Sequence, residues 1–326
     1  MDRLQKSVDA ALGAPGRPAA SADATRALGA LLLGDLLDGV DATRMLVISD
    51  GPLNGVPFAA LPCGTQPDQL LVDRFVLGYS PSLSLAMTGP RHVPAAHTRV
   101  AVVSDPVYAA DDRRLQLAVG AGGGTYRGPR EASPNNLTRL PYSGMEARAV
   151  LRALGDSHAI ELAGFDATPA RVLALPTDDL AVLHFATHAL ARQDSPDQSA
   201  LYLSEYTADG SLVRDSRITA GQIARSGLRA DVVVLSGCAT GDGSELRGEG
   251  VLGLTYGFLA NGSRAVVASL WPIEDASTAR FMSEFYRAYR AKAHPAEALR
   301  SAQLRTRQVT APAVWSSFVV RANGFP

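Results

Sequence analysis

Short apolar runs alternate with longer segments of helical periodicity over most of the chain after residue 99. Runs rich in Val, Leu and Ala predict buried strands, and apolar residues spaced three and four apart predict amphipathic helices. Strands are expected near residues 100–104, 160–162, 181–186, 201–203, 232–236, 265–269 and 315–320, and helices near 144–154, 168–175, 220, 250–260, 276–291 and 295–308. This alternation is typical of an α/β fold, with a mostly parallel sheet covered by helices on both faces.

Before residue 99 the pattern is less regular and shows no obvious chemistry. It predicts a helix over 26–37, a strand over 45–48, and a pair of strands from the apolar runs 70–72 and 75–79. We therefore predict two parts, an N-terminal subdomain over residues 1–98 and a main domain over residues 99–326. In the main domain, the helix at 144–154 is expected to place Met145, Ala149, Val150 and Leu154 on one apolar face.

Composition excludes several classes of function. The chain has 326 residues, of which 46% are hydrophobic and 19% charged, so it has enough apolar material for a full core. Its net charge of −1 gives no reason to expect nucleic acid or an anionic membrane as a partner. The 2 cysteines are too few for a disulfide framework and do not lie at metal-ligand spacing. With no signal peptide or membrane-length apolar run, we expect a cytoplasmic protein that needs no cofactor.

Two of the predicted strands end close to reactive side chains. The run 181–186 ends two residues before His188, and the run 232–236 ends two residues before Cys238, about 50 residues further along. The carboxyl ends of parallel strands meet at one edge of a sheet, where a cysteine and a histidine can form a thiol nucleophile with its acid–base partner. The backbone N–H groups of Cys238 and Ala189 are the natural donors to the oxyanion that such a reaction forms.

Each of these residues also has an ordinary structural explanation. A cysteine beside an apolar strand is more often inert packing than a nucleophile, and a lone histidine is more often a hydrogen-bonded structural residue. Their joint placement favours catalysis. His184 lies on the strand itself and is expected to pack or to support the site. A metal site is not expected, because His184 and His188 have no third convergent ligand in the sequence.

A glycine pattern imitates a dinucleotide-binding fingerprint. Gly248, Gly250 and Gly253 open a predicted helix, and Asp275 follows about 20 residues later. In the true motif the first glycine follows its strand almost at once, whereas about a dozen residues separate Ser236 from Gly248 here. Nucleotide binding is therefore a distant alternative.

Ordered segments spread along the chain share the pattern of a known family. They are residues 57–61, 79–82, 140–147, 184–188, 235–241, 248–254, 267–275, 281–286 and 297–303. Together they resemble the CHAT family, caspase-related cysteine peptidases that are often joined to tetratricopeptide (TPR) repeats. The resemblance covers roughly residues 28–322 and implies a caspase-like sheet, with His188 as acid–base and Cys238 as nucleophile. Where the family usually has glycine after this histidine, the chain has Ala189, which keeps the N–H but restricts the backbone.

The resemblance also implies where substrate specificity lies. Separases, which are relatives of this family, place an acidic residue after the matching Leu-Trp segment, where it receives a substrate arginine. Asp275 occupies that position with Glu274 beside it, and Asp105, at the end of an earlier strand, is a second candidate. A buried carboxylate selects a guanidinium through paired, charge-assisted hydrogen bonds. The structural alternative is that Asp275 caps the helix that begins near residue 276.

We therefore predict a cysteine endopeptidase that cleaves a protein substrate after Arg or Lys through a thioester. The polar loops 189–199 and 239–249 flank the dyad, and Arg247 in the second loop is a candidate self-cleavage site. No sensor or repeat domain is evident, so a regulatory protein or a TPR-type domain is expected as the activating partner. The main alternative is a non-catalytic CHAT module that serves as an interaction scaffold.

Overall fold

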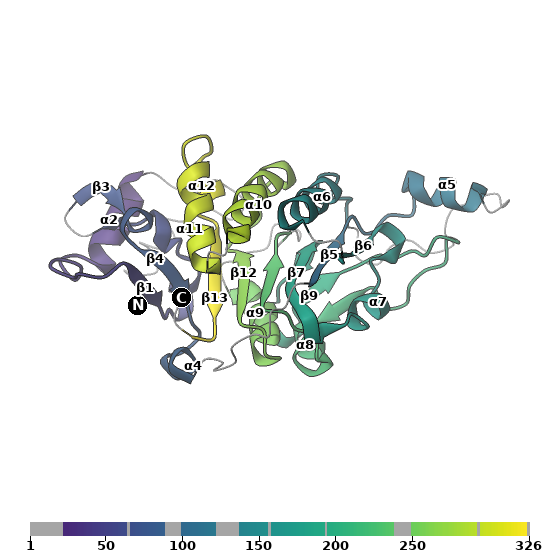
Figure 1. Ribbon diagram of the computed structural model, residues 1–326, viewed down its shortest axis with the longest axis horizontal. Helices are drawn as coiled ribbons and strands as arrows, with labels where there is room; N and C mark the ends of the chain where they lie inside the picture. The colour runs from purple at the N-terminus through teal and green to yellow at the C-terminus, as the bar shows by residue number, and fades with distance from the viewer. Residues whose placement is uncertain are drawn as a thin grey trace.

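The structure is a computed structural model that describes residues 22–63, 66–88, 99–121, 137–155, 158–192, 194–237, 249–291 and 294–324. Its centre is an eight-stranded, mostly parallel sheet flanked by helices, as the sequence predicts (Figure 1). From one edge of the sheet to the other, the strands are β1 (Arg44–Val47), β4 (Val76–Tyr79), β13 (Phe318–Ala322), β12 (Ala265–Ser269), β11 (Val232–Leu235), β7 (Leu180–Ala186), β5 (Arg99–Ser104) and β6 (Ile160–Ala163).

One block of this sheet is entirely parallel. It consists of β12, β11, β7, β5 and β6, each parallel to its neighbour. β13 is antiparallel to β12 but parallel to β4, which is parallel to β1. The carboxyl ends of the parallel block therefore share one edge of the sheet, where open α/β folds place ligands and catalytic groups.

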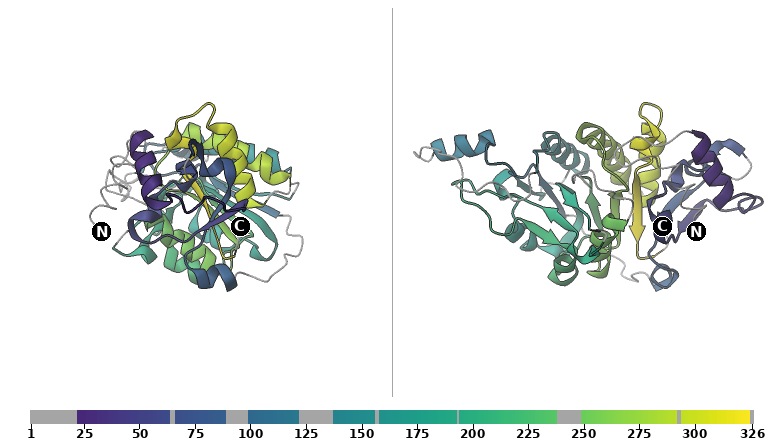
Figure 2. Two further views of the ribbon diagram at one scale, coloured as in Figure 1. Left: turned by 90° about the vertical axis from the view of Figure 1, so that its left-hand side faces the viewer. Right: turned by 180° about the vertical axis from the view of Figure 1, so that it is seen from behind.

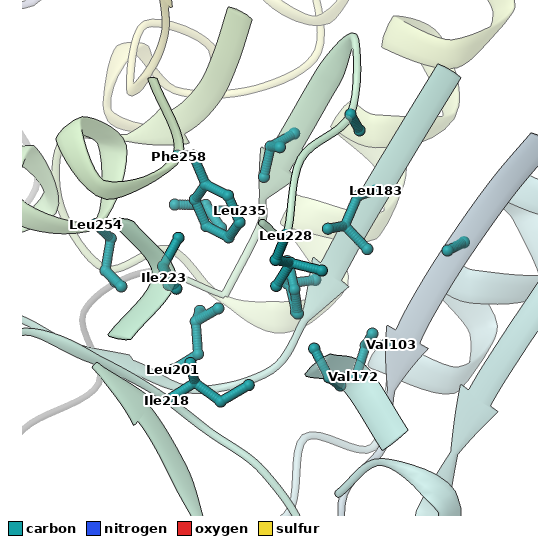
Figure 3. Packing of buried hydrophobic residues seen from close by; sticks show 14 of the residues in the cluster. Val103, Val172, Leu183, Leu201, Ile218, Ile223, Leu228, Leu235, Leu254 and Phe258 are labelled. Carbon is teal, nitrogen blue, oxygen red and sulfur yellow. The ribbon is translucent and has the colours of Figure 1, made fainter. Parts of the chain in front are cut away.

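Both faces of the parallel block are buried under helices (Figures 1 and 2). One face is covered by α6 (Ser143–Leu154) and α10 (Asp275–Arg290), with α11 (Pro295–Thr306) beside them over β13 and β4, and the other by α7 (Pro169–Leu173), α8 (Ala220–Ser226) and α9 (Glu249–Ala260). Along β7, Leu183 lies in the same cluster as Phe258 of α9 (Figure 3), while Val182 lies in the cluster that contains Phe285 of α10. Burial on both faces explains why these strands are unbroken apolar runs in the sequence.

The N-terminal part extends the same sheet. β1 and β4 join it through β13, and α2 (Ala22–Leu32) packs in a cluster that also contains Leu270 and Trp315 from the C-terminal part. Figure 1 accordingly shows the purple N-terminal elements beside the yellow C-terminal ones. The boundary at residue 98 between a subdomain and a main domain stays a prediction.

The predicted pairing of the runs 70–72 and 75–79 is wrong. The strand β3 (Gln66–Leu70) pairs instead with β2 (Pro62–Cys63), and β4 pairs with β1 and β13. Between them the chain forms the short helix α3 (Leu71–Arg74), because the Asp73 carboxylate accepts a hydrogen bond from the N–H of Leu70 at 2.9 Å and so caps its first turn.

Two predicted helix features also differ from the structure. The helix expected over 26–37 ends at Leu32, shortly before Gly34, whose φ of 42° is left-handed and cannot continue a helix. In α6 the buried stripe is Ser143, Glu146, Ala147 and Val150, while Met145 is 54% exposed. The core-facing side of α6 is therefore rotated from the predicted face and carries a carboxylate.

The remaining elements complete the edges of the fold. The predicted strand at 315–320 divides into α12 (Pro312–Trp315) and β13, because Pro312 starts a helical turn. A small antiparallel sheet, of which only the middle strand was predicted, consists of β8 (Ala189–Leu190), β9 (Ala200–Tyr202) and β10 (Arg217–Thr219). Two short helices, α4 (Leu83–Thr88) and α5 (Arg113–Ala121), lie outside the sheet. Of the helices in the described ranges, none combines the length and apolarity that crossing a bilayer requires.

Candidate functional site

The chain segments that follow β7 and β11 touch at the edge of the sheet. The two strands are adjacent and parallel. Just beyond them, Gly237 lies so close to Thr187 that a Cβ atom on Gly237 would be 2.1 Å from the Thr187 carbonyl oxygen. His188 and Cys238 are thus the next residues along two backbones that are in contact. Cys238 itself lies outside the described residues, so the distance from its sulfur to the His188 ring stays a prediction.

The His188 ring is held by a backbone carbonyl. Its Nε2 lies 2.6 Å from the carbonyl oxygen of Thr138, and its centroid lies 4.9 Å from that of Tyr108. A carbonyl only accepts hydrogen bonds, so Nε2 carries the proton of the neutral ring and Nδ1 is the nitrogen that can accept one. Burial lowers the pKa of His188, and the Thr138 carbonyl partly opposes that shift because it favours the protonated ring.

The backbone of His188 is fixed by a hydroxyl inserted into the small sheet. The His188 N–H donates to the Tyr108 hydroxyl at 3.1 Å, and this hydroxyl donates to the Tyr202 carbonyl at 3.0 Å. The Tyr202 N–H in turn donates a hydrogen bond to the His188 carbonyl oxygen at 2.8 Å. Ala189, opposite Leu201 in β9, is consequently in a non-hydrogen-bonded pair and its N–H is directed away from β9. The oxyanion role of Ala189 stays a prediction.

A pocket of about 140 Å³ lies next to Gly237 at the same edge of the sheet. It is lined by Leu140, Ser143, Glu146, Ala186, Ser236, Gly237, Ile273, Asp275 and Thr278. Two of these residues, Asp275 and Glu146, are acidic, and none of the described residues in the lining is Lys or Arg. A cavity that pairs carboxylates with an apolar rim is suited to a cationic, partly aliphatic side chain.

Asp275 does not cap its own helix. It is the first residue of α10, and its Oδ2 accepts a hydrogen bond from the N–H of Tyr142 at 2.6 Å, at the start of α6. Burial raises the pKa of Asp275; the Tyr142 N–H opposes the rise, and Glu146, Asp105 and Glu274 add to it. A cation placed in the pocket would relieve this crowding of negative charge.

Glu146 was missed at the sequence level. It is only 1% exposed, and its Oε1 lies 2.9 Å from Nε2 of His184. The other ring nitrogen of His184, Nδ1, lies 2.9 Å from the Tyr286 hydroxyl. His184 is therefore more than a packing residue, because it holds the buried Glu146 carboxylate at the pocket. A carboxylate on the apolar stripe of a helix is the signal that points to Glu146, because such groups are rarely buried without a partner.

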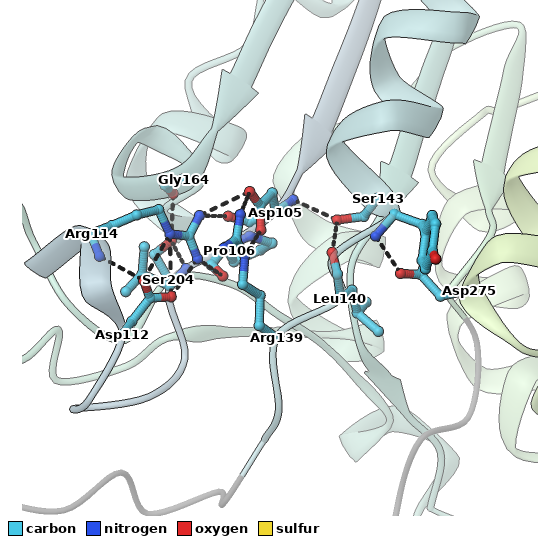
Figure 4. Close-up of polar contacts among 12 residues, drawn as sticks. Asp105, Pro106, Asp112, Arg114, Arg139, Leu140, Ser143, Gly164, Ser204 and Asp275 are labelled. Carbon is cyan, nitrogen blue, oxygen red and sulfur yellow. Dashed lines mark hydrogen bonds and ion pairs between the residues drawn. The ribbon is translucent and has the colours of Figure 1, made fainter.

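The other two acidic candidates lie outside the pocket lining. The Asp105 carboxylate is bound by Arg139, through Nε at 2.9 Å and Nη2 at 2.8 Å, and by Nη1 of Arg114 at 3.0 Å (Figure 4). Glu274 occupies the position before α10 and accepts a hydrogen bond from the Ser277 hydroxyl at 3.3 Å. A substrate arginine would have to displace Arg139 to reach Asp105, so Asp275 is the better-placed carboxylate.

Gly253 of the dinucleotide-like pattern, and Gly257 one turn further along α9, serve helix packing. A Cβ on Gly253 would lie 2.1 Å from the Pro196 carbonyl oxygen, and one on Gly257 would lie 2.8 Å from the Ala220 carbonyl oxygen. These residues let α9 approach the 190s loop and α8 closely. Gly248 lies outside the described residues. In the described part of the chain, no three His, Cys, Asp or Glu side chains gather as a metal site would require.

Gly253→Ala is expected to destabilise the protein. Overpacking against a backbone carbonyl costs about 1–3 kcal/mol, which outweighs the gain of about 1 kcal/mol from helix propensity. Gly120→Ala in α5 is the matched control, since a Cβ there meets nothing within 4 Å and should be neutral or stabilising. Thermal unfolding of the two variants measures the difference. Equal melting temperatures would contradict the close approach of α9 to Pro196.

Two curated proteins match most of the chain at low sequence identity. The chain is 27% identical over 319 residues to human Tetratricopeptide repeat protein 28 and 26% identical over 325 residues to the mouse protein. Each alignment covers 85% of this chain and 12% of the relative, so the chain spans a small fraction of those proteins.

Solved structures provide a second comparison. The crystal structure of gingipain R, an Arg-specific cysteine proteinase, superimposes with a TM-score of 0.51 at 10% identity, covering 98% of this chain and 73% of that one. This likeness shows the caspase-like fold alone. Separase from Saccharomyces cerevisiae, solved with securin, matches with a TM-score of 0.47 at 11% identity over 86% of this chain and 15% of that one. The CHAT domain model matches residues 19–323, and the chain therefore belongs to the CHAT domain family.

Proposed function

We propose that the chain is a cysteine endopeptidase in which Cys238 is the nucleophile and His188 the acid–base group. The main support for this proposal is the contact of Gly237 with the Thr187 backbone. This contact brings together, at the edge of the sheet, the two chain segments that continue into His188 and Cys238. The Thr138 carbonyl supports it further, since it holds the imidazole in the tautomer whose Nδ1 can accept a proton.

The proposed reaction has two halves. The Cys238 thiolate attacks the scissile carbonyl carbon, and the carbonyl electron pair moves to oxygen, where the N–H groups of Cys238 and Ala189 are the proposed donors. As the C–N bond breaks, the His188 imidazolium transfers its proton to the leaving amine, and a thioester remains. Water, deprotonated by His188, then hydrolyses the thioester and restores the thiol.

The proposed substrates are proteins cleaved after Arg or Lys. The basis is the acidic pocket beside Gly237, whose lining includes the carboxylates of Asp275 and Glu146. One Asp275 oxygen is bound by the Tyr142 N–H, while the other makes no hydrogen bond to the described part of the chain. A peptide-library cleavage profile tests the specificity. Cleavage confined to acidic or apolar positions would contradict it.

Asp275→Asn is expected to lower kcat/KM for substrates with Arg before the cleaved bond by about 10- to 100-fold. Loss of a hydrogen bond to a charged group costs about 1.5–3 kcal/mol, and each 1.4 kcal/mol is tenfold. Alkylation of Cys238 by iodoacetamide should stay within about twofold of the wild type, because that reagent does not use the pocket. Glu274→Gln is the matched control and should leave both rates unchanged. An equal loss of cleavage and alkylation in Asp275→Asn would remove its specificity role.

We further propose that the peptidase does not turn over protein substrates until a partner acts, while the Cys238–His188 pair is already formed without the partner. His188 is only 2% exposed, so a substrate backbone reaches it only after the surrounding chain shifts. The similarity to Tetratricopeptide repeat protein 28 makes a TPR-type domain the proposed partner. Self-cleavage at Arg247, which lies outside the described residues, belongs to the same proposal. Intact-mass measurement of the wild type beside Cys238→Ala tests it.

A non-catalytic scaffold is the second candidate function. It is favoured by the same deep burial of His188 and by relatives named for an interaction repeat. A peptide-like electrophile separates the two functions, because a scaffold thiol reacts no faster in the native protein than after unfolding.

A further inference from the structure

A single short segment, residues 137–142, contacts both halves of the site. Its Thr138 carbonyl oxygen lies 2.6 Å from Nε2 of His188, and its Tyr142 N–H donates to Asp275 at 2.6 Å. Neither contact belongs to a helix or a strand ladder. Regular secondary structure therefore does not fix the position of the Thr138 carbonyl relative to the His188 ring. Something else in the segment must hold it against the ring.

Arg139, the neighbour of Thr138, supplies that hold. Its guanidinium makes two parallel hydrogen bonds to the Asp105 carboxylate, with Nε to Oδ1 at 2.9 Å and Nη2 to Oδ2 at 2.8 Å (Figure 4). Such paired contacts fix orientation as well as distance. The hydrogen bonds to Asp105 raise the pKa of Arg139 further above its already high ordinary value, so the guanidinium is charged. The peptide that carries the Thr138 carbonyl is thus joined directly to a residue anchored at the end of β5.

Asp105 is itself held in an unfavourable backbone conformation. Its φ of 48° makes it the one non-glycine residue with positive φ in the described ranges, although it precedes Pro106, which disfavours helical geometry. The Arg114 side chain holds it there, donating to the Asp105 carbonyl oxygen at 2.8 Å, and the Ser143 hydroxyl accepts its N–H at 3.1 Å. This strained turn presents the carboxylate to Arg139 from a rigid strand end.

We propose that the Asp105–Arg139 ion pair is a positioning element that presses the Thr138 carbonyl against His188 and so fixes the ring for reaction with Cys238. This inference rests on the proposed peptidase function. Neither Arg139 nor Asp105 lines the pocket, although the Asp105 N–H donates to the Ser143 hydroxyl in its wall, and both act on His188 through the backbone of residue 138. Asp105, a candidate for substrate recognition by sequence, is in this account a support for the acid–base group.

The test is the pH dependence of iodoacetamide alkylation at Cys238, followed by peptide mass spectrometry with the buried Cys63 as internal reference. In the wild type the midpoint should lie well below the ordinary thiol value of about 8.5, because His188 stabilises the thiolate. In Arg139→Gln the midpoint should rise by about one pH unit and the rate at pH 6 should fall about tenfold. Arg139→Lys should be intermediate, since an ammonium cannot make the bidentate contact.

Asp105→Asn should reproduce the Arg139→Gln profile. Asn tolerates the left-handed backbone, so this variant removes the charge without adding strain. The double variant should be no worse than either single one, because both remove the same contact. Arg229→Gln, which breaks the exposed pair with Asp178, is the matched control and should keep the wild-type profile.

The outcomes separate the inference from the function on which it rests. If the wild type has the low midpoint but Arg139→Gln and Asp105→Asn share it, the positioning role is overturned and the peptidase proposal stands. If the wild-type midpoint equals that of the unfolded chain, the dyad is overturned and the positioning role with it. The Arg139 side chain is half-exposed, and without it the Asp105 carboxylate still pairs with Arg114. The melting temperature of Arg139→Gln should therefore stay within about 3 °C of the wild type.

Discussion

Cys238→Ala is expected to abolish cleavage of every peptide substrate and to leave the melting temperature within about 3 °C of the wild type. The proposed reaction passes through a bond to the Cys238 sulfur, which the alanine variant lacks. His188→Ala should lower kcat by about 10²- to 10⁴-fold, the usual contribution of a positioned acid–base group. Steady-state kinetics on peptides with a central arginine, with the activating partner present if one is required, measures both.

The second cysteine provides the matched control. Cys63 is buried in the N-terminal cluster, on the opposite side of β13 from the site. Cys63→Ala should keep the wild-type turnover and lose about 1–2 kcal/mol of stability, because it removes a packed sulfur. The two variants thus have opposite expected phenotypes. Turnover that survives in Cys238→Ala would remove that residue as nucleophile.

Gly237→Ala is expected to be the most damaging substitution that removes no functional group. Its Cβ would lie 2.1 Å from the Thr187 carbonyl oxygen, 2.9 Å from the carbonyl carbon and 3.3 Å from the Thr187 nitrogen. Backbone cannot rotate away as a side chain does, so the segments that carry residues 188 and 238 must separate. Overpacking of this kind costs about 1–3 kcal/mol, and a displacement of about 1 Å costs roughly 10²-fold in rate.

Gly144→Ala tests whether that loss is specific. Gly144 lies at the same sheet edge, in α6, but a Cβ there meets only Asp105 at 3.8 Å, an ordinary contact. This control should keep full activity and gain slightly in stability from helix propensity. Measurement of kcat/KM and melting temperature for both variants makes the comparison. Activity of Gly237→Ala within about threefold of the wild type would contradict the close approach of the two backbones.

The main sheet could be predicted because its strands are buried on both faces. Val232–Leu235 and Leu180–Ala186 are short apolar runs that periodicity detects without knowledge of their partners. The runs 70–72 and 75–79 look alike in sequence, but a single carboxylate, Asp73, converts the first into a helical turn. Such a local cap competes with strand pairing, and the pattern of hydrophobic residues carries no information about it.

The reactive residues could be placed from sequence, but their supports could not. Every residue has a carbonyl, so nothing in the sequence marks the one on Thr138 as the partner of His188. The Tyr108 hydroxyl acts across a gap in a small sheet whose pairing depends on the tertiary fold. The hydrophobic pattern places the buried face of α6 about one residue away from where it lies, so it does not mark Glu146 as buried. These contacts join segments that are distant in sequence, and they emerge only when the chain is folded.

The most direct test of the central claim is the rate of Cys238 modification by iodoacetamide at pH 6 in the native protein, compared with the same thiol after unfolding. At that pH an ordinary thiol is almost entirely protonated and reacts slowly. A sulfur paired with the His188 ring should react at least tenfold faster in the native state, and His188→Ala should erase the difference. A native rate equal to or below the unfolded rate would show that the two groups do not form a reactive pair.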